Sequence, residues 1–537
     1  MADFFYRTED IRPDEVEGYF VETQKDREII NALKNRNPVV LVGSRGVGKS
    51  FLLRVAEYEM LGSLENDGVF PVYLSFSRSS LINTSDVQQF QHWMLSRICS
   101  KIVRDLKKAG YILASSPAIK TLTGGGLDPN IDQKTPIEKL ADQFEDSWKN
   151  ADVDIDASIL PTVDDFRDSV AEICLDLNIK KIVVLIDEAA HILLPEQQRQ
   201  FFTLFRDLRS PYLACKAAVY PGVTSYGDTF QPSHDATMLF FERDILGSNY
   251  VETMKEIVEK QADSRLQGNI AKNGANFAVL AYCASGNPRV LLKTLSQAPR
   301  VSSSQVNEVI REYYRTQLWS EHSTLPEKYE GHRHLIDWGR KFVEGIVLPD
   351  LQSKNLQYLD QEKQTTCFFW VHRDSPQAVK ESLKLLAYSG IVNEHASGIR
   401  ATRSEIGTRY AVNLGALISQ ESSPTVTGLD IARNLTPKRM VEFGINHVAY
   451  QSLSNEGQDF NEPNVADVLQ QQLERSISVL DITEWQRGKL KELGLNTIGE
   501  VLLASESSLQ KLAYVGEKRS RRMRNAALAA VFEYLSG

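Results

Sequence analysis

The chain has 537 residues, and its 61 Lys and Arg against 70 Asp and Glu give a net charge of −9. This length predicts roughly three or four domains, each large enough to bury a core. The acidic balance argues against a protein that coats nucleic acid indiscriminately, so any such contact must be local. Five scattered cysteines without CxxC spacing indicate reduced thiols in the core.

The sequence contains no run of about eighteen apolar residues, which a membrane-spanning helix would need. The opening residues, MADFFYRTED, lack the basic and apolar regions of a secretion signal. We therefore expect a cytoplasmic protein without membrane contact. The nine histidines are dispersed, and we expect His332 and His334 to lie on a polar connector rather than to bind a metal ion.

The clearest motif is VVLVGSRGVGKSFLL at residues 39–53, where a glycine-rich turn joins a predicted strand to a predicted helix. Glycines let successive backbone N–H groups converge on an anion, and the helix N-terminus adds partial positive charge. The GxxxxGK[ST] pattern predicts that Lys49 reaches the β- and γ-phosphates of ATP and that the Ser50 hydroxyl binds Mg²⁺. The residues expected to bind the nucleotide are Gly43, Ser44, Arg45, Gly46, Val47, Gly48, Lys49, Ser50 and Phe51.

Residues 180–188, KKIVVLIDE, form an apolar run that ends in two carboxylates. Such runs are typical of strands buried on both faces of a parallel sheet, and VFPVYLSF at 69–76 predicts a second strand. A phosphate-binding loop needs an acid at a neighbouring strand tip to hold hydrated Mg²⁺, and Asp187 fits this role. Glu188 is placed to orient and deprotonate an attacking water. The alternative is that Asp187 only caps a following helix.

Two regions, one between these strands and one after them, give less specific indications of structure and function. Residues 127–170 hold twelve acids and four bases, which favours a solvated acidic insertion near 113–170, with a docking site for a basic partner as the alternative. The Pro, Gly and Ser residues at 113–136 are typical of loops, so loops are predicted there. A strand predicted at 216–224 ends in polar groups, Tyr220, Thr224 and Ser225, which are candidates for contact with the γ-phosphate.

Residues 281–292, AYCASGNPRVLL, contain a turn between two apolar helices. Pro288 suits the first turn of the second helix, and Arg289 lies at its exposed start, where it can fold over a bound nucleotide. With the P-loop and the Asp-Glu strand, this turn makes the first 300 residues resemble the origin-recognition type of AAA+ ATPase and the related STAND signal-transduction NTPases.

This resemblance implies an α/β fold, in which an ASCE-type P-loop core with a parallel sheet spans 1–250 and a helical lid and connector span 251–345. It gives Arg289 the role called sensor 2 and makes Arg243 the candidate for an intersubunit finger. It also implies hydrolysis of ATP with Mg²⁺, in which Asp187 holds the metal ion and Glu188 the water.

Residues 346–418 resemble the winged-helix domain that origin-recognition-type ATPases carry after the lid. Residues 346–364 are expected to be polar and irregular, followed by a short strand, a helix, and two strands at 391–412 that meet in a turn at Ser397-Gly398. Arg400, Arg403 and Arg409 on this wing are either phosphate contacts or solvated strand charges.

A polar linker is predicted at 419–427, within a linker and helical segment over 419–476. Residues 477–537 resemble a helix-hairpin-helix domain, closest in plan to the C-terminal domain of the bacterial RNA polymerase alpha subunit. In that plan a glycine turn presents backbone N–H groups to a DNA phosphate, beside lysine or arginine. Residues 511–524 hold six bases and one acid, and the expected DNA-binding residues are Gly516, Lys518, Arg519, Ser520, Arg521 and Arg522. Trp485 and Gly488 replace the polar DNA-reading residues of the polymerase domain, which argues against sequence-specific binding in that style.

Two functions follow from these patterns. The first is an ATPase switch that binds DNA as a homo-oligomer. The second is a nucleotide-driven oligomeric scaffold whose C-terminal modules bind a protein. Because no second catalytic constellation is found, we expect a separate effector protein. Prokaryotic ATPases of this type occur in replication, mobile-element maintenance and defence, and a defence system suits an ATPase without an effector domain.

Overall fold

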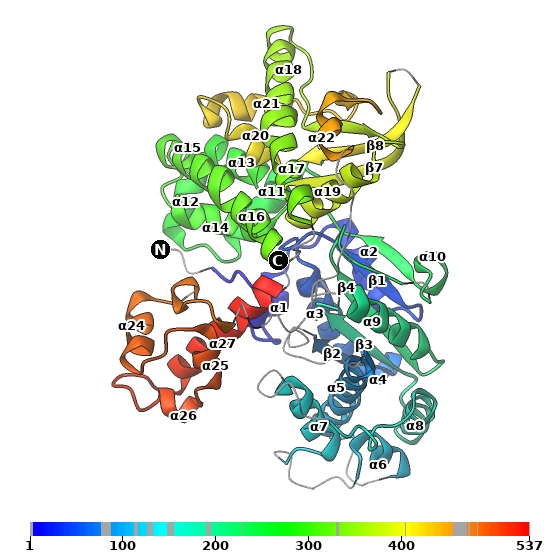
Figure 1. The fold of residues 1–537 in the computed structure, drawn as a ribbon. Helices are drawn as coiled ribbons and strands as arrows, with labels where there is room; N and C mark the ends of the chain where they lie inside the picture. The colour runs from blue at the N-terminus through cyan, green and yellow to red at the C-terminus, as the bar shows by residue number, and fades with distance from the viewer. Residues whose placement is uncertain are drawn as a thin grey trace.

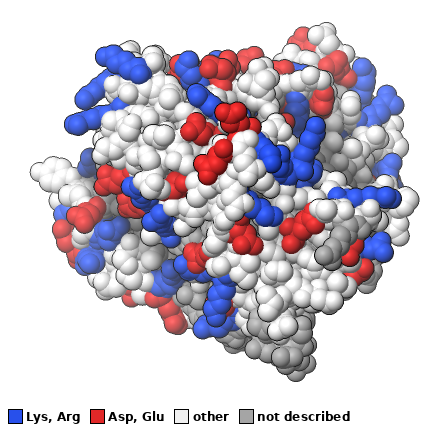
Figure 2. Space-filling model, turned by 90° about the horizontal axis from the view of Figure 1, so that it is seen from above, with Lys and Arg blue, Asp and Glu red and all other residues white. Residues whose placement is uncertain are grey.

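The computed structural model describes residues 4–76, 87–111, 116–125, 133–147, 155–189, 195–227, 229–328, 332–402, 404–454, 470, 473–480 and 482–535. Figure 1 shows a sheet body at the lower right, an upper body of helices with a second sheet, and a C-terminal unit of short helices at the lower left. On the face shown in Figure 2, Lys and Arg are interspersed with Asp and Glu. Among the described helices, none is both long and apolar enough to span a membrane.

The sheet body is built on five parallel strands in the order β2-β3-β4-β1-β5. The strands are β1 (Val39–Val42), β2 (Val69–Ser75), β3 (Lys181–Asp187), β4 (Leu213–Val219) and β5 (Thr237–Phe240). β4 lies between β1, which leads into the P-loop, and β3, which carries the two acids. The predicted α/β P-loop fold with a parallel sheet is therefore confirmed.

Helices cover both faces of this sheet, because side chains alternate along each strand. Val39 and Leu41 face α2 (Gln24–Lys34) and α3 (Lys49–Gly62), whereas Val40 and Val42 belong to the core on the other face. That second layer is formed by α5 (Val87–Lys108), α8 (Val163–Asp176) and α9 (Pro195–Asp207). All five cysteines are buried and free, as predicted.

The acidic insertion forms a helical layer on α5 rather than the predicted loops. It contains α6 (Pro117–Thr123) and α7 (Pro136–Glu145), which pack on α5, with α6 also packed on α8. Both α6 and α7 begin with Pro behind a capping Ser or Thr. Two of its acids face arginines of α5: Glu138 lies 2.8 Å from Arg104, and the buried Glu145 lies 3.3 Å from Arg97. Part of the acidic charge thus attaches the insertion to the sheet body.

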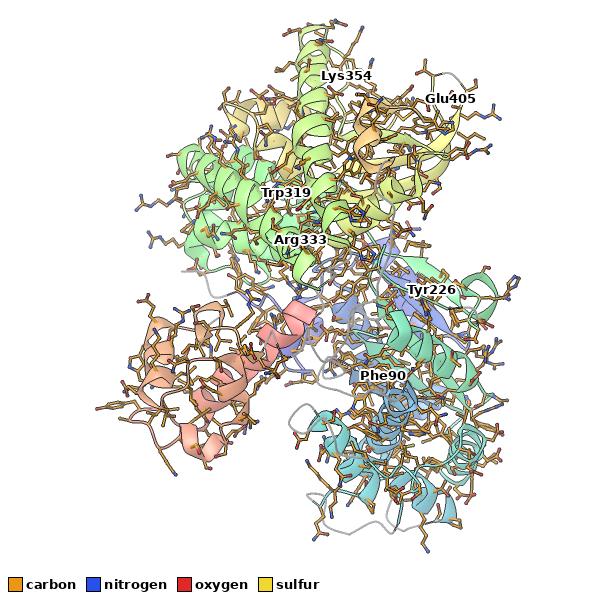
Figure 3. The ribbon with its side chains drawn as sticks, in the orientation of Figure 1. Phe90, Tyr226, Trp319, Arg333, Lys354 and Glu405 are labelled. Atoms are coloured by element: carbon orange, nitrogen blue, oxygen red, sulfur yellow. The ribbon has the colours of Figure 1, made fainter. Side chains whose placement is uncertain are left out.

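The upper body, residues 250–454, has one continuous hydrophobic core. Its helices are α11 (Tyr250–Glu259), α12 (Ser264–Lys272), α13 (Gly274–Cys283), α14 (Pro288–Gln297), α15 (Ser303–Glu312), α16 (Leu318–Lys328), α17 (Arg333–Phe342), α18 (Leu348–Asp360), α19 (Gln377–Tyr388), α20 (Leu414–Ile418) and α21 (Leu429–Arg433). Trp319 of α16, labelled in Figure 3 near Arg333 of α17, is buried in this body. The expected lid and the following unit therefore share one core.

Two expectations for this body are wrong. Residues 346–364 are not irregular, because α18 buries Leu348, Leu351 and Asn355 at helical spacing. The segment 419–427 is not a free linker, since Pro424 and Thr425 are buried and the Thr425 N–H donates to Asn307 Oδ1 at 2.9 Å.

The second sheet has the order β7-β8-β6-β9, with β6 (Phe368–His372), β7 (Val392–Arg400), β8 (Ile406–Val412) and β9 (Val441–Phe443). The predicted strand, helix, strand, strand order is observed, and its winged-helix identity stays a prediction. The turn predicted at Ser397-Gly398 is wrong: β7 continues to Arg400 before β8 begins at Ile406, and Gly398 (φ +71°) lies at an irregularity within β7.

The C-terminal unit has a small core of its own. It contains α24 (Glu484–Glu492), α25 (Ile498–Leu503), α26 (Glu506–Leu509) and α27 (Glu517–Leu535), with α27 packed on α25 and α26. Gly494 adopts φ +75° between α24 and α25, as a helix-ending glycine does. Before α27, Tyr514 takes the left-handed conformation (φ +67°), and Gly516 does not.

Candidate nucleotide site

A cavity of about 490 Å³ lies at the carboxyl ends of β1, β3 and β4. Its walls come from segments far apart in sequence: residues 5–11, the P-loop at 45–52, Asp187 with Glu188, Tyr220, and Arg289. Parallel strands place their carboxyl ends at one edge, where ligands of open α/β sheets bind. The structure thus brings together the phosphate loop, the acidic pair and the arginine that the sequence singled out.

The P-loop conformation depends on its glycines. Gly46 (φ +80°) and Gly48 (φ +113°), which precedes the first residue of α3, adopt backbone angles that other residues rarely take. A Cβ on Gly46 would lie 2.6 Å from Asn287 Oδ1, and one on Gly43 would lie 2.6 Å from the Phe241 carbonyl oxygen. Larger residues at these positions would push the loop away from its neighbours.

Lys49 is the buried cation of the site, with 7% of its surface exposed. Its Nζ donates to the Gly43 carbonyl at 2.5 Å and to the Ser44 carbonyl at 3.0 Å, and lies 4.3 Å from the centre of the Tyr220 ring. Burial lowers the pKa of the Lys49 ammonium to about 8. A bound triphosphate would favour the charged form of Lys49, because it supplies negative charge beside it.

Asp187 ends β3 with 1% of its surface exposed. Its Oδ2 accepts a hydrogen bond from the Tyr73 hydroxyl at 2.7 Å, and its Oδ1 accepts one from the Glu188 N–H at 3.0 Å. The Arg54 guanidinium lies 3.4 Å from the centre of the Tyr73 ring and supports it from behind. Asp187 is therefore held in one orientation toward the cavity.

The donor set fits Mg²⁺. The Asp187 carboxylate and the Ser50 hydroxyl are hard oxygen ligands, and both residues line the cavity. Within the part of the chain that the structure describes, no group of three or more His, Cys, Asp or Glu side chains is placed to hold a metal ion. A metal ion here would thus be shared with nucleotide oxygens, as Mg²⁺ usually is in phosphoryl-transfer sites.

Glu188 follows Asp187 with a left-handed backbone (φ +54°), which is unusual for this residue type. Burial, and next the neighbouring Asp187 charge, raise the pKa of the Glu188 carboxyl to about 7. The Ser75 hydroxyl donates to Glu188 Oε2 at 3.2 Å. A carboxylate with this pKa, facing a cavity, is suited to accept a proton at neutral pH.

The turn before α14 closes the cavity from the upper body. The Asn287 amide donates to the Arg45 carbonyl at 2.7 Å, so the turn lies directly on the P-loop. The Arg289 Nε donates to the Tyr6 carbonyl at 2.9 Å, and burial lowers the pKa of its guanidinium. Arg289 is therefore positioned at the cavity wall, where the resemblance placed it.

Two further expected catalytic residues, Thr224 and Arg243, differ in their relation to the cavity. Thr224 is outside the cavity lining, and its hydroxyl donates to the Tyr220 carbonyl at 2.6 Å, because β4 ends at Val219 before the predicted strand is complete. Arg243 lines the cavity of its own chain with 12% of its side chain exposed, 3.6 Å from the buried Asp26 carboxylate. Arg243 thus faces the cavity of its own chain, and its role as an intersubunit finger stays a prediction.

Sequence reasoning missed three parts of the site. Glu242, one residue before Arg243, accepts hydrogen bonds from the Ser44 N–H at 2.7 Å and the Ser44 hydroxyl at 2.5 Å. Tyr73 orients Asp187, and the N-terminal segment 5–11 lines the cavity. These residues belong to no motif. Only the order of the strands in the sheet brings β5 beside β1 and β2 beside β3.

The predicted DNA contacts divide into exposed and internal groups. Gly516 is open, since a Cβ there would meet nothing within 4 Å, and Arg521 and Arg522 are exposed. Ser520 is fully buried and its hydroxyl donates to the Glu517 carbonyl at 3.0 Å, so it is an internal residue rather than a surface contact. The backbone of Lys518 lies in α27, and its side chain is outside the described residues.

The wing arginines also differ from one another. Arg400 is exposed on β7, whereas Arg409 donates to the Pro437 carbonyl at 2.6 Å and lies over the Phe368 ring. Arg403 lies outside the described residues. Of the two described arginines, Arg400 is exposed and Arg409 is half-buried, and a phosphate contact by either stays a prediction.

The sheet order and the cavity define the class of this protein as a P-loop NTPase with an α/β fold. Residues 4–116 match the model of the ORC-CDC6-like family. The matched part contains the P-loop and agrees with the predicted resemblance to origin-recognition-type P-loop ATPases over these residues.

Solved structures add a comparison of overall shape. The chain is similar to the Orc1 protein of Aeropyrum pernix in complex with DNA, at 12% identity and a TM-score of 0.32, covering 78% of this chain and 95% of that one. It is also similar to the Walker-type ATPase paby2304 of Pyrococcus abyssi, at 15% identity and a TM-score of 0.33, covering 80% and 97%. Comparison with curated proteins finds no match.

Proposed function

We propose that this protein is a Mg²⁺-dependent ATPase whose nucleotide state controls DNA binding. The observation that carries the ATPase proposal is the convergence of Lys49, Asp187, Glu188 and Arg289 on one cavity beside a glycine-rich loop. These four side chains come from three separate segments of the chain. Their convergence supports a site for a bound, charged and hydrolysable ligand.

In the proposed complex, backbone amides of residues 43–50 and the Lys49 ammonium bind the triphosphate. Phe20 and Phe51, whose rings stack at 6.0 Å, provide an apolar wall for the base. Ser50 and Asp187 hold Mg²⁺, which neutralises charge on the phosphate oxygens when bound. Arg289 adds a positive charge from the upper body.

Glu188 has the role of general base in this proposal. It orients a water molecule and accepts its proton as the oxygen attacks the γ-phosphate, and the pKa of about 7 suits proton transfer near neutral pH. Ser75 holds Oε2 of this carboxylate, and the strained backbone fixes its direction.

The test replaces Glu188 with Gln. We expect turnover of ATP to fall by roughly 10²- to 10⁴-fold, because the amide cannot accept the proton, while ATP binding measured by calorimetry is retained. The matched control is Glu65→Gln on the exposed surface of α4 (Leu64–Asp67), which removes the same charge and should leave turnover unchanged. Normal hydrolysis by Glu188→Gln would refute this role.

A switch needs contact between the nucleotide site and the rest of the chain, and the P-loop makes such contacts. Arg45 forms an ion pair with Glu321 of α16 at 2.8 Å, and the Ser44 hydroxyl lies 3.4 Å from Asn393 Oδ1 of β7. A change in the loop on nucleotide binding would therefore act directly on two elements of the upper body. We propose that this rearranges the DNA-binding surfaces.

DNA binding is assigned to the C-terminal unit, where Gly516, Arg519, Arg521 and Arg522 are exposed at the start of α27. Contacts to several phosphates predict a steep fall in duplex affinity with salt. The alternative function, an oligomeric scaffold that binds a protein partner, predicts no such salt dependence. Size-exclusion chromatography with ATP and with ADP tests the proposed homo-oligomer, and co-purification tests the separate effector expected in a prokaryotic defence or mobile-element system.

A further inference from the structure

Four residues form an aromatic and basic surface on the C-terminal unit, which we call the Trp485 cluster: the Trp485, Lys489 and Arg519 side chains meet, and Tyr514 joins them through its backbone carbonyl. The Arg519 guanidinium lies 5.0 Å and the Lys489 ammonium 5.8 Å from the centre of the Trp485 ring. Arg519 also donates to the Tyr514 carbonyl at 2.6 Å. Residues from α24, from the turn before α27, and from α27 itself therefore meet at one place.

The two rings of this cluster are not used by the core of the unit. Trp485 is 42% exposed and Tyr514 is 84% exposed, and neither belongs to the hydrophobic cluster of this unit. Tyr514 also adopts the left-handed backbone conformation, which is unfavourable for an L-residue with a bulky side chain. One arginine, Arg519, thus contacts an exposed tryptophan and the carbonyl of a strained, exposed tyrosine, which suggests binding rather than packing.

The charges around the rings favour an anionic ligand. Lys489 is paired with Glu492 at 2.7 Å, and Arg521 with Glu517 at 2.7 Å, whereas Arg519 contacts Trp485 and a backbone carbonyl. Arg519 also lies in the first turn of α27, where the helix N-terminus favours negative charge. The surface thus offers aromatic faces and positive charge side by side, a combination suited to nucleotides with accessible bases.

We propose that the Trp485 cluster binds unpaired bases of DNA at a strand end or a single-strand to double-strand junction. The inference deepens the proposed function and rests on it. In a continuous duplex the base faces are stacked on one another, so exposed aromatic rings have nothing to stack on, whereas an overhang presents free faces. The phosphates are bound by the basic start of α27, and the first unpaired bases stack on Trp485 and Tyr514.

The experiment compares three DNA probes with the full chain at fixed ATP, Mg²⁺ and salt: a blunt 20-bp duplex, the same duplex with a six-nucleotide overhang, and the single strand. The overhang carries 2-aminopurine at its first unpaired position, because the fluorescence of this base is quenched by stacking. The variants are Trp485→Ala and Tyr514→Asn, since asparagine tolerates the left-handed conformation that Tyr514 adopts. Leu503→Ala is the matched control, as Leu503 is 61% exposed on α25 of the same unit.

We expect the wild type to bind overhang DNA more tightly than blunt duplex and to quench 2-aminopurine. Each aromatic variant should lose about tenfold in affinity for the overhang probe, with little change for blunt duplex and loss of quenching. Leu503→Ala should match the wild type.

The inference fails if the wild type binds blunt and overhang DNA equally, or if the aromatic variants weaken both probes to the same extent. In either case the proposed DNA binding still stands. If the chain binds none of the three probes at low salt, the proposed DNA binding and this inference both fail, and a protein partner becomes the occupant of the surface.

Discussion

The nucleotide cavity and the C-terminal unit use charged residues in opposite ways. In the cavity, Lys49 and Asp187 are almost fully buried, and P-loop carbonyls and Tyr73 of β2 fix their positions. In the C-terminal unit, Arg519 and Arg521 are exposed, and their hydrogen-bond partners lie within five residues. Buried groups are thus positioned before a ligand arrives, whereas exposed groups are free to bind without supporting the fold.

The largest effect expected from this comparison is on stability, at a buried group. His322 of α16 is fully buried, with Nδ1 3.1 Å from Ser389 Oγ and Nε2 3.1 Å from the Ile336 carbonyl oxygen. Burial lowers the pKa of His322 from its ordinary value to about 4. Between pH 4 and the pKa of His322 in the unfolded chain, the unfolded chain binds more protons than the folded one. The contribution of His322 to stability is therefore complete above the pKa of the unfolded chain, and it is lost as the pH falls toward 4.

The loss should reach about 3 kcal/mol near pH 4, because each pKa unit corresponds to about 1.4 kcal/mol. Urea unfolding followed by tryptophan fluorescence between pH 4.5 and 7.5 measures it in wild type and in His322→Gln. The variant should be less stable at pH 7 and should lose less stability on acidification. Equal pH dependence in the two proteins would show that His322 does not carry this effect.

The next effect is on binding, at exposed groups. Changing Arg521 and Arg522 together to Ala should lower duplex affinity by roughly tenfold and reduce the slope of log K against log salt by about two, since two phosphate contacts are lost. The stability of the chain should not change, because both side chains are exposed.

The matched control changes Lys120 of α6 and Lys139 of α7 to Ala, which removes the same charge from two exposed sites in the acidic insertion. Its DNA binding should equal that of the wild type. If the two double variants have the same affinity for DNA, then either DNA binding depends on net charge alone or the DNA binds at another surface.

The smallest effect tests backbone contact at the turn before α27. Gly516 does not need a left-handed conformation, and an added Cβ would meet nothing within 4 Å, so Gly516→Ala should fold normally. If a DNA phosphate approaches this backbone, the methyl group should weaken duplex binding by roughly three- to tenfold. Gly268→Ala, equally open on α12, is the control, and wild-type binding by Gly516→Ala would exclude a close approach.

Local patterns were sufficient where one short segment decides the structure. The P-loop, the strand before Asp187 and the strand at 69–76 were predicted from glycine spacing or from apolar runs, and the structure has them within one or two residues. The turn at Ser397-Gly398 was mispredicted for a related reason: serine and glycine mark turns locally, and pairing with β8 instead keeps this segment in a strand.

Tertiary structure decided the features that depend on neighbours. Because β4 ends at Val219, Thr224 lies outside the cavity. Because β5 lies beside β1, Glu242 accepts a hydrogen bond from Ser44. Neither can be predicted from a single segment, because strand order is set by how the whole sheet buries its two faces.

The sequence by itself determined that this protein has a phosphate-binding loop, an acidic pair at a strand tip and a basic C-terminal helix, because each depends on residue types within a few positions. Only the tertiary structure decided that Arg243 faces its own site, that the acidic insertion packs as helices, and that Arg519 contacts both the Trp485 ring and the Tyr514 carbonyl. The physical reason is that burial and charge pairing act between residues that the chain brings together only when it folds.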